Sequence, residues 1–196
     1  NPELTSGGSS GGAGCGLGTQ LLPVADGSDM MGSLRNPGAF NNVIGFRPSQ
    51  GRVPSVPKSD PFYGQLSTAG PMGRNVEDTI RLLISMSGYD SRAPMSRKDA
   101  LPWADTFNAV DLVGYRIGWL ADYDGYLPTE PGVVDLCESA LASLVLTGAI
   151  VEVCRPDYDM ARLWQTWLTF RHWALSTMRE FYDDPELKAL LRPEVI

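Results

Sequence analysis

The segment that decides the fold spans residues 7–48 and contains two glycine-rich motifs. The first is GGSSGG at 7–12. The second is DGSDMMGSLRNPGAFNNVIGFRP at 26–48, which follows the apolar run LLPVA at 21–25. Glycine costs about 1 kcal/mol relative to alanine inside a helix, so tracts this rich in glycine serve an unusual backbone geometry rather than a regular core element. Each motif carries a serine, Ser9 and Ser33, that is a candidate for chemistry.

Three other interpretations of these motifs fit less well. A flexible Gly/Ser linker conflicts with the shortness of the tract and with the strand-like run that follows it. A phosphate-binding loop needs a Gly-Lys-Ser/Thr ending, but the first lysine is Lys58, and residues 12–18 match the dinucleotide-binding pattern only raggedly. A Ser-His-Asp triad would have to use the single histidine, His172, which lies in a helical, aromatic segment. Any base that activates a serine here is therefore something other than imidazole.

The two motifs together resemble the amidase signature family. The resemblance is carried by GGSSGG, by the serine of GSDMMGSLRNPGAF and by the following VIGFRPSQGRVP, and it continues through residues 67–90 and 111–120. It implies an α/β fold, with a mixed, largely parallel sheet flanked by helices, and hydrolysis of amides by a Ser–cis-Ser–Lys triad. By position it implies that Ser33 is the nucleophile, that Ser9 is the bridging serine with a cis peptide bond, and that Ser10 is its supporting neighbour.

The chemistry implied by the resemblance is physically consistent. A serine hydroxyl becomes a good nucleophile only when a neighbouring base accepts its proton, and a lysine can be that base if burial lowers its pKa. A second serine between the two relays the proton. The resemblance assigns the oxyanion hole to the main-chain amides of Met30, Met31, Gly32 and Ser33, and such donors contribute roughly 3–4 kcal/mol each. Asp29 and Arg35 flank the nucleophile as supporting residues, and they either form a structural ion pair or are each simply solvated.

Two features depart from the family pattern. Many relatives have glycine at the position of Met31, so a positive φ there would strain this chain; the Met31 side chain would otherwise line the acyl pocket. The family's catalytic lysine lies upstream of the Gly/Ser motif, whereas Lys58, Lys98 and Lys188 all lie downstream. We therefore expect residues 1–196 to be one piece of a larger amidase signature domain truncated at both ends, with a signature core at 1–90, a βαβ unit and aromatic helix at 91–196, and no activity when isolated.

Composition narrows the class of partner. The chain has 196 residues, of which 43% are hydrophobic and 20% charged, and its net charge is −7, so nucleic acid and anionic membranes are poor partners. No apolar run approaches the length of a membrane span. The three scattered cysteines indicate reduced thiols and a cytoplasmic location, and one histidine argues against a metal site. The chemistry needs no cofactor and no metal, and the expected partner is a small-molecule amide.

Periodicity and breakers predict the remaining elements. The resemblance implies a helix at 11–20, which its own glycines would make weak. From the residues themselves we expect a helix at 75–87, a helical turn at 36–42, an extended piece at 43–46, and strands at 21–25 and 65–69. Asn75 should cap the second helix, and its stripe of Val76, Ile80, Leu83 and Ile84 should face the core. A parallel βαβ unit should comprise a strand at 115–121, a helix at 131–147 and a strand at 149–154.

The loop at 122–129 follows the first strand of this unit. Tyr123, Asp124 and Tyr126 in it are either pocket residues or part of an ordinary surface loop. A last helix, from about 160 to 182, repeats aromatic residues at helical spacing. If that aromatic face is exposed, it favours a homodimer.

The sequence predicts an amidase that hydrolyses a carboxylic amide to a carboxylate and ammonia or an amine through a serine acyl-enzyme. One alternative within the family is the glutaminase subunit of a tRNA-dependent amidotransferase. A second alternative, from another class, is a catalytically dead scaffold or binding fragment. A lysine in the expected motif of the parent gene would favour an enzyme over this second alternative.

Overall fold

The structure is a computed structural model that describes residues 3–56, 66–102 and 110–191. Lys58, residue 65 and the end of the chain after 191 lie outside the described residues. Contacts divide the chain into two units, residues 1–107 with 164–196, and residues 108–163. That both units belong to one larger domain remains a prediction from the sequence.

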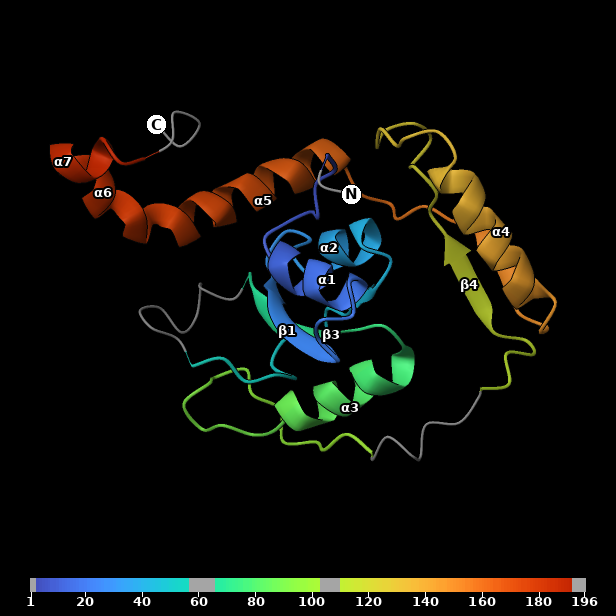
Figure 1. The fold of residues 1–196 in the computed structure, drawn as a ribbon. Coiled ribbons are helices and arrows are strands. Elements are labelled where there is room, and N and C mark those ends of the chain that lie inside the picture. Colours follow the sequence, from blue (N-terminus) through green and yellow to red (C-terminus); the bar gives the residue numbers. More distant parts are fainter. Residues whose placement is uncertain (1–2, 57–65, 103–109, 192–196) are drawn as a thin grey trace. The chain divides into compact units, whose positions relative to one another are not determined.

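The first unit is built on a three-stranded sheet. Its elements in chain order are α1 (Gly11–Gly18), β1 (Val24–Asp29), α2 (Arg35–Phe40), β2 (Ile44–Gly45), β3 (Thr68–Gly73) and α3 (Val76–Met86). The strand order is β1-β3-β2, and both pairings are antiparallel. Helices α1 and α2 lie on one face of the sheet and α3 lies on the other (Figure 1). The unit is therefore a three-layered α/β/α arrangement, which confirms the predicted fold class.

Successive residues of β3 face the two helical layers in turn. Met72 is fully buried and packs with Leu17 of α1 and with Leu34, which precedes α2. A Cβ on the neighbouring residue, Gly73, would instead meet Thr79 of α3. Successive residues of a strand point to opposite faces, so one short strand provides packing surface for helices on both sides.

Leu34 is held in a socket made largely of main chain. A Cβ at Gly45 would overlap the carbonyl oxygen of Leu34, and a Cβ at Gly70 would come within 2.9 Å of a Leu34 methyl group. Gly45 is needed because its backbone lies against the backbone of Leu34, and Gly70 is needed because a Cβ there would also overlap the carbonyl oxygen of Phe46 at 2.3 Å. The residue next to Ser33 is thereby fixed in space.

The strands of the first unit differ from the sequence prediction in position and direction. Residues 21–25 are not a buried strand, because Leu21 is 80% exposed and β1 begins at Val24. The strand predicted at 65–69 is found three residues later, as β3. Pairing of Asp29 with Thr68 and of Gly27 with Gly70 sets this register, so cross-strand contacts outweigh the local apolar run. Among the described strands, the expected parallel pairing occurs only in the second unit.

The helix predicted at 75–87 is present as α3, with the predicted cap. The Asn75 side-chain oxygen accepts a hydrogen bond of 2.8 Å from the amide of Asp78. The predicted apolar stripe is only partly correct, because Val76 is exposed while the polar Thr79 is buried against β3. Thr79 is accommodated there because its hydroxyl donates to the carbonyl of Asn75 at 2.7 Å, which satisfies it inside the packed layer.

We expect Asn75→Ala to lower the free energy of unfolding by about 1 kcal/mol, because the amide of Asp78 loses its acceptor at the first turn of α3. Urea unfolding followed by circular dichroism measures the change. Asn75→Ser keeps a capping oxygen and should retain most of the stability. Equal losses for the alanine and serine variants would contradict the capping role.

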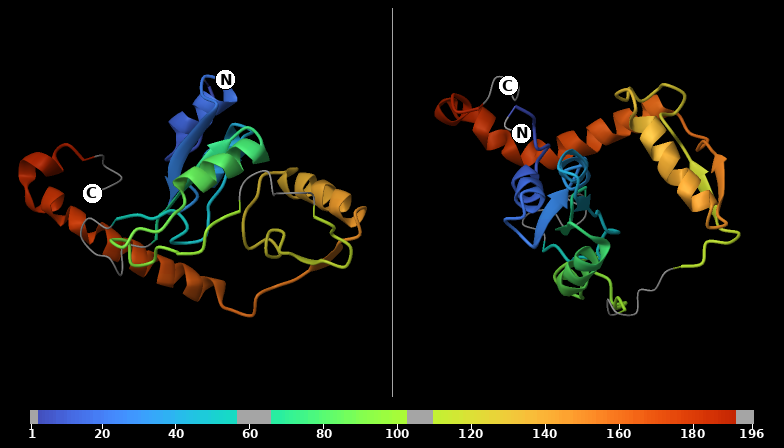
Figure 2. Two further views of the ribbon diagram at one scale, coloured as in Figure 1. Left: turned by 90° about the horizontal axis from the view of Figure 1, so that it is seen from below. Right: turned by 45° about the vertical axis from the view of Figure 1, so that its right-hand side comes forward.

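The second unit contains the βαβ arrangement that the sequence predicts. Strands β4 (Arg116–Trp119) and β5 (Ile150–Val153) pair in parallel, with Arg116 opposite Ile150, and α4 (Val133–Val145) connects them. Figure 2 shows α4 running alongside the strand pair. Gly148 has the positive φ, +91°, expected just after a helix. Each element is shorter than predicted, and the difference lies at its ends.

The predicted C-terminal helix is interrupted. The predicted span holds α5 (Met160–Leu175), a 3₁₀ turn (Ser176–Met178) and α6 (Arg179–Asp183), and a further short helix, α7 (Pro185–Lys188), follows beyond it. Asp184 caps α7 by accepting from the amides of Glu186 and Leu187. Trp164, Phe170 and Trp173 on α5 are each about half exposed. Within the described part of the chain, no helix is long and apolar enough to cross a bilayer.

Candidate active site

The two serine motifs meet in space. The amide of Ser10 donates a hydrogen bond to the carbonyl oxygen of Ser33 at 3.2 Å, and the hydroxyl of Ser10 is 3.5 Å from the carbonyl oxygen of Ser28. The Gly8–Ser9 peptide bond is cis, which is the form that the resemblance implies. Ser9 is exposed and Ser33 is half-buried. Both candidate serines thus lie on adjoining turns at the edge of the first unit, within reach of solvent.

The turn before Ser33 takes its left-handed residue at Gly32. Gly32 has φ +101°, whereas Met31 does not have a positive φ. The strain considered for Met31 therefore does not arise, because the conformation that favours glycine falls one residue later. The Met31 side chain is 54% exposed. It is free to project from the turn rather than fill the core.

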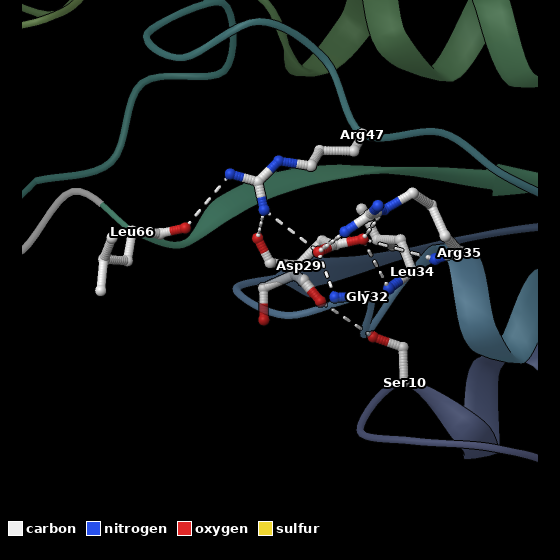
Figure 3. Close-up of polar contacts among 8 residues, drawn as sticks. Ser10, Asp29, Gly32, Leu34, Arg35, Arg47 and Leu66 are labelled. Atoms are coloured by element: carbon white, nitrogen blue, oxygen red, sulfur yellow. Dashed lines mark hydrogen bonds and ion pairs between the residues drawn. The ribbon is translucent and has the colours of Figure 1, made fainter. Parts of the chain in front are cut away.

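A fully buried carboxylate, Asp29, organises this turn. It ends β1 and accepts hydrogen bonds from the main-chain amides of Gly32 at 2.7 Å, Leu34 at 3.3 Å and Arg35 at 3.4 Å. Of the two alternatives left open for Asp29 and Arg35, the structure has the ion pair, since Arg35 Nε lies 2.9 Å from Asp29 Oδ2. Figure 3 shows these donors converging on one side chain. The carboxylate thereby ties together the residues on both sides of Ser33.

Arg47 is a second cation on Asp29, and the sequence analysis did not assign it a role. Its Nη1 contacts both the main-chain carbonyl oxygen of Asp29 and, at 3.1 Å, Asp29 Oδ1. Its Nη2 donates to the carbonyl oxygen of Leu66 at 3.2 Å (Figure 3). The only sign of this residue in the sequence was the arginine of GFRP at 45–48, which directly follows the extended piece predicted at 43–46. Nothing in the sequence indicated that this arginine reaches back to β1.

The surroundings of Asp29 lower its pKa. Burial alone would raise it, but the hydrogen bonds from Arg35, from the Gly32 amide, from Arg47 and from the Leu34 amide together outweigh burial. The pKa of Asp29 therefore lies well below the ordinary value for an aspartate. The carboxylate stays charged at neutral pH and holds its donors throughout the physiological range.

The amides near Ser33 divide into two groups. The Gly32 amide is directed at Asp29, so it is already engaged, although the resemblance assigns it to the oxyanion hole. In the described part of the chain, no hydrogen bond uses the amides of Met30, Met31 or Ser33. Those three remain available as donors. No described group of histidine, cysteine, aspartate and glutamate side chains could hold a metal ion.

A family profile described as Amidase matches residues 1–183. The chain belongs to the amidase signature family. Among curated proteins, it is 35% identical over 163 residues to the A subunit of glutamyl-tRNA(Gln) amidotransferase from Pseudomonas putida, and 36% identical over 162 residues to the Pseudomonas syringae protein of that name. Each match covers 82% of the chain and 33% of the relative. The chain thus spans about a third of the length of these relatives.

Solved structures agree with the assignment of the amidase fold. A bacterial aryl acylamidase of the amidase signature family superposes with a TM-score of 0.87 at 28% identity, and the match covers 99% of this chain and 41% of that one. A 6-aminohexanoate cyclic dimer hydrolase superposes with a TM-score of 0.75, also at 28% identity, over 93% of this chain and 38% of that one. The resemblance stated from the sequence is confirmed.

Proposed function

We propose that the protein hydrolyses carboxylic amides with Ser33 as the nucleophile and Ser9 as the proton relay. The observation that carries the proposal is the Ser10–Ser33 main-chain hydrogen bond of 3.2 Å, because it sets the turn containing Ser9 against the turn containing Ser33. The amides of Met30, Met31 and Ser33 support it further, because none of them donates to another described residue. They provide the donors that a developing oxyanion needs.

In the proposed reaction, the Ser33 hydroxyl oxygen attacks the amide carbon. Its proton passes to the hydroxyl of Ser9, which gives its own proton to a neutral lysine. The amides of Met30, Met31 and Ser33 stabilise the negative oxygen of the tetrahedral intermediate. The C–N bond then breaks, the amine leaves with a proton returned from the lysine, and water hydrolyses the acyl-serine by the same route. The resemblance puts that lysine before Ser9, where this sequence has none.

The test is an amine-release screen of the full protein that carries this chain, over aryl, aliphatic and amino-acid amides. We expect equal amounts of carboxylate and amine from at least one class, with a rapid first turnover if the acyl-serine accumulates. Absence of release from every class would favour the catalytically dead scaffold or binding fragment.

We expect Ser9→Ala to lower kcat/KM by roughly 10²–10⁴, which is the usual contribution of a group that transfers a proton. The fold should survive, because Ser9 is exposed and its side chain makes no hydrogen bond within the described residues. Steady-state kinetics on the best amide measures the effect. Ser9→Thr keeps the hydroxyl and should be less impaired, whereas activity unchanged by alanine would remove Ser9 from the mechanism.

A second candidate function is the glutaminase reaction of a tRNA-dependent amidotransferase. It is favoured by the 35% identity to the A subunit of glutamyl-tRNA(Gln) amidotransferase over 82% of the chain. Including L-glutamine in the amide screen distinguishes the glutaminase reaction from that of a stand-alone amidase. Preference for glutamine over all other amides would favour the amidotransferase role, and turnover of aryl or aliphatic amides by the protein alone would favour a stand-alone amidase.

Two further points of the proposal concern setting and self-association. Cys15, Cys137 and Cys154 are all free thiols, which supports a reducing, cytoplasmic location.

The exposed aromatic residues of α5 support a homodimer. Size-exclusion chromatography with light scattering tests the latter directly.

A further inference from the structure

We infer that Arg47 is a positioning residue for the oxyanion hole and acts through the peptide group between Asp29 and Met30. This inference rests on the proposed function, because it concerns the amide that would bind the oxyanion. It adds to that site a residue near the end of the second motif, 14 positions after Ser33.

Arg47 controls the geometry of one peptide group. Arg47 Nη1 donates to the carbonyl oxygen of Asp29. The nitrogen of that same peptide group belongs to Met30, whose amide has no partner among the described residues. The bond is trans, and in a planar trans peptide the C=O and N–H groups point in opposite directions. A guanidinium that fixes the carbonyl therefore also fixes the direction of the Met30 amide.

The same hydrogen bond changes the strength of the donor. A charged donor on the carbonyl oxygen polarises the peptide group, and polarised groups make stronger hydrogen bonds at their other end. Asp29, Arg35 and Arg47 form a cluster of one carboxylate and two guanidiniums, so its net charge is +1. This charge lies on the carbonyl side of the peptide group between Asp29 and Met30. Both effects favour negative charge on the far side of the peptide, where the oxyanion would form.

Arg47 is itself held in place. Its Nη2 donates to the carbonyl oxygen of Leu66, at 3.2 Å, and its Nη1 reaches Asp29 Oδ1 at 3.1 Å. Its side chain is 31% exposed. A lysine at this position could approach Asp29 but would not span both acceptors with fixed geometry. Arg47→Lys is therefore the conservative variant, and Arg47→Met removes the charge while keeping an unbranched chain.

The chain offers a matched control in Arg52. Arg52 binds Asp99 in a similar way, with Nη1 on the main-chain carbonyl oxygen at 2.7 Å and Nη2 on Oδ2 at 2.6 Å. Its side chain is only 13% exposed. Arg52→Met thus removes a similarly engaged guanidinium, whose hydrogen bonds to described residues go to Asp99 and not to the serine turns. Any general cost of losing such an arginine should appear in this variant too.

The experiment compares Arg47→Met, Arg47→Lys and Arg52→Met in the full protein that carries this chain. Loss of a direct oxyanion donor costs about 10²–10³ in kcat, so an indirect effect should be smaller. We expect Arg47→Met to lower kcat about tenfold with KM unchanged, Arg47→Lys to lie between it and wild type, and Arg52→Met to match wild type. A kcat for Arg47→Met equal to that of Arg52→Met would overturn the inference.

A second readout does not depend on activity. In protein labelled with ¹⁵N-methionine, the Met30 amide proton is assigned with the Met30→Leu variant. We expect its resonance to move upfield in Arg47→Met and to stay in place in Arg52→Met. If wild-type protein hydrolyses no amide, the proposed function fails, and the Met30 resonance still decides the positioning role. An unmoved Met30 resonance in a folded Arg47→Met protein would refute that role.

Discussion

Replacing Asp29 by alanine should lower the free energy of unfolding by about 3 kcal/mol or more, the largest stability effect of any single change described here. Removing one partner of a buried charge cluster leaves the others uncompensated. Here the buried amides of Gly32 and Leu34 lose their hydrogen-bond acceptor, and Arg47 loses one of its acceptors. Arg35 contributes less, because its side chain is 57% exposed and water can replace the carboxylate.

Urea unfolding measures the loss in the free energy of unfolding for Asp29→Ala and, as a control, for Asp99→Ala. Asp99 also pairs with two arginines, but its side chain is 54% exposed. We therefore expect the Asp99 change to be far smaller. Equal losses for the two variants would mean that burial of Asp29 contributes nothing to stability.

The contribution of Asp29 to the free energy of unfolding also depends on pH. The pKa of Asp29 is lower in the folded chain than in the unfolded chain, so its contribution to stability is fully present above the unfolded value of 3.8 and is lost as pH falls below it. Asp29→Asn should remove this part of the acid dependence. Its unfolding free energy should therefore fall less steeply than that of wild type below about pH 4.

Replacing Ser33 by alanine should lower kcat/KM by about four orders of magnitude or more, because no other group can form the acyl intermediate. A fluorophosphonate probe should label the wild-type protein at Ser33, as shown by peptide mass spectrometry, and should leave the variant unlabelled. The fold should be retained, since Ser33 contributes its carbonyl oxygen, not its hydroxyl, to the contact with Ser10.

Ser85→Ala is the matched control for this change. Ser85 is exposed on α3, and its hydroxyl donates only to the carbonyl of Arg81 within the helix. This variant should keep both activity and labelling. Labelling of wild-type protein at a serine other than Ser33 would contradict the assignment of the nucleophile.

Local signals in the sequence predict the parts of the fold that depend on local interactions. The capping role of Asn75, the turn at Gly148 and the parallel pairing of β4 and β5 were all predictable, because each follows from residues close in sequence or from a standard βαβ connection. That the two serine motifs lie together was also predictable, although only from the resemblance, which assigns Ser9 and Ser33 to one site and does not specify the main-chain hydrogen bond between Ser10 and Ser33. Composition and periodicity alone left the role of the two serines open.

The register of β1 and the role of Arg47 could not be predicted in this way. Strand β1 extends through Gly27 to Asp29, where propensity is low, because it is held by residues 68–73 across the sheet. Arg47 reaches Asp29, which precedes it by 18 residues, and the carbonyl of Leu66, which follows it by 19. Both features arise from contacts between distant segments, and neither leaves a periodic or compositional signal.

The main-chain socket around Leu34 limits how this protein can be altered by laboratory evolution. Its walls are the backbone at Gly45 and Gly70, and any larger residue at either position would displace the turn that carries Ser33. Saturation libraries aimed at new substrates should therefore leave both glycines untouched. Met31, with its side chain 54% exposed beside Ser33, is the better position to randomise, since changes there alter the rim of the site without moving its framework.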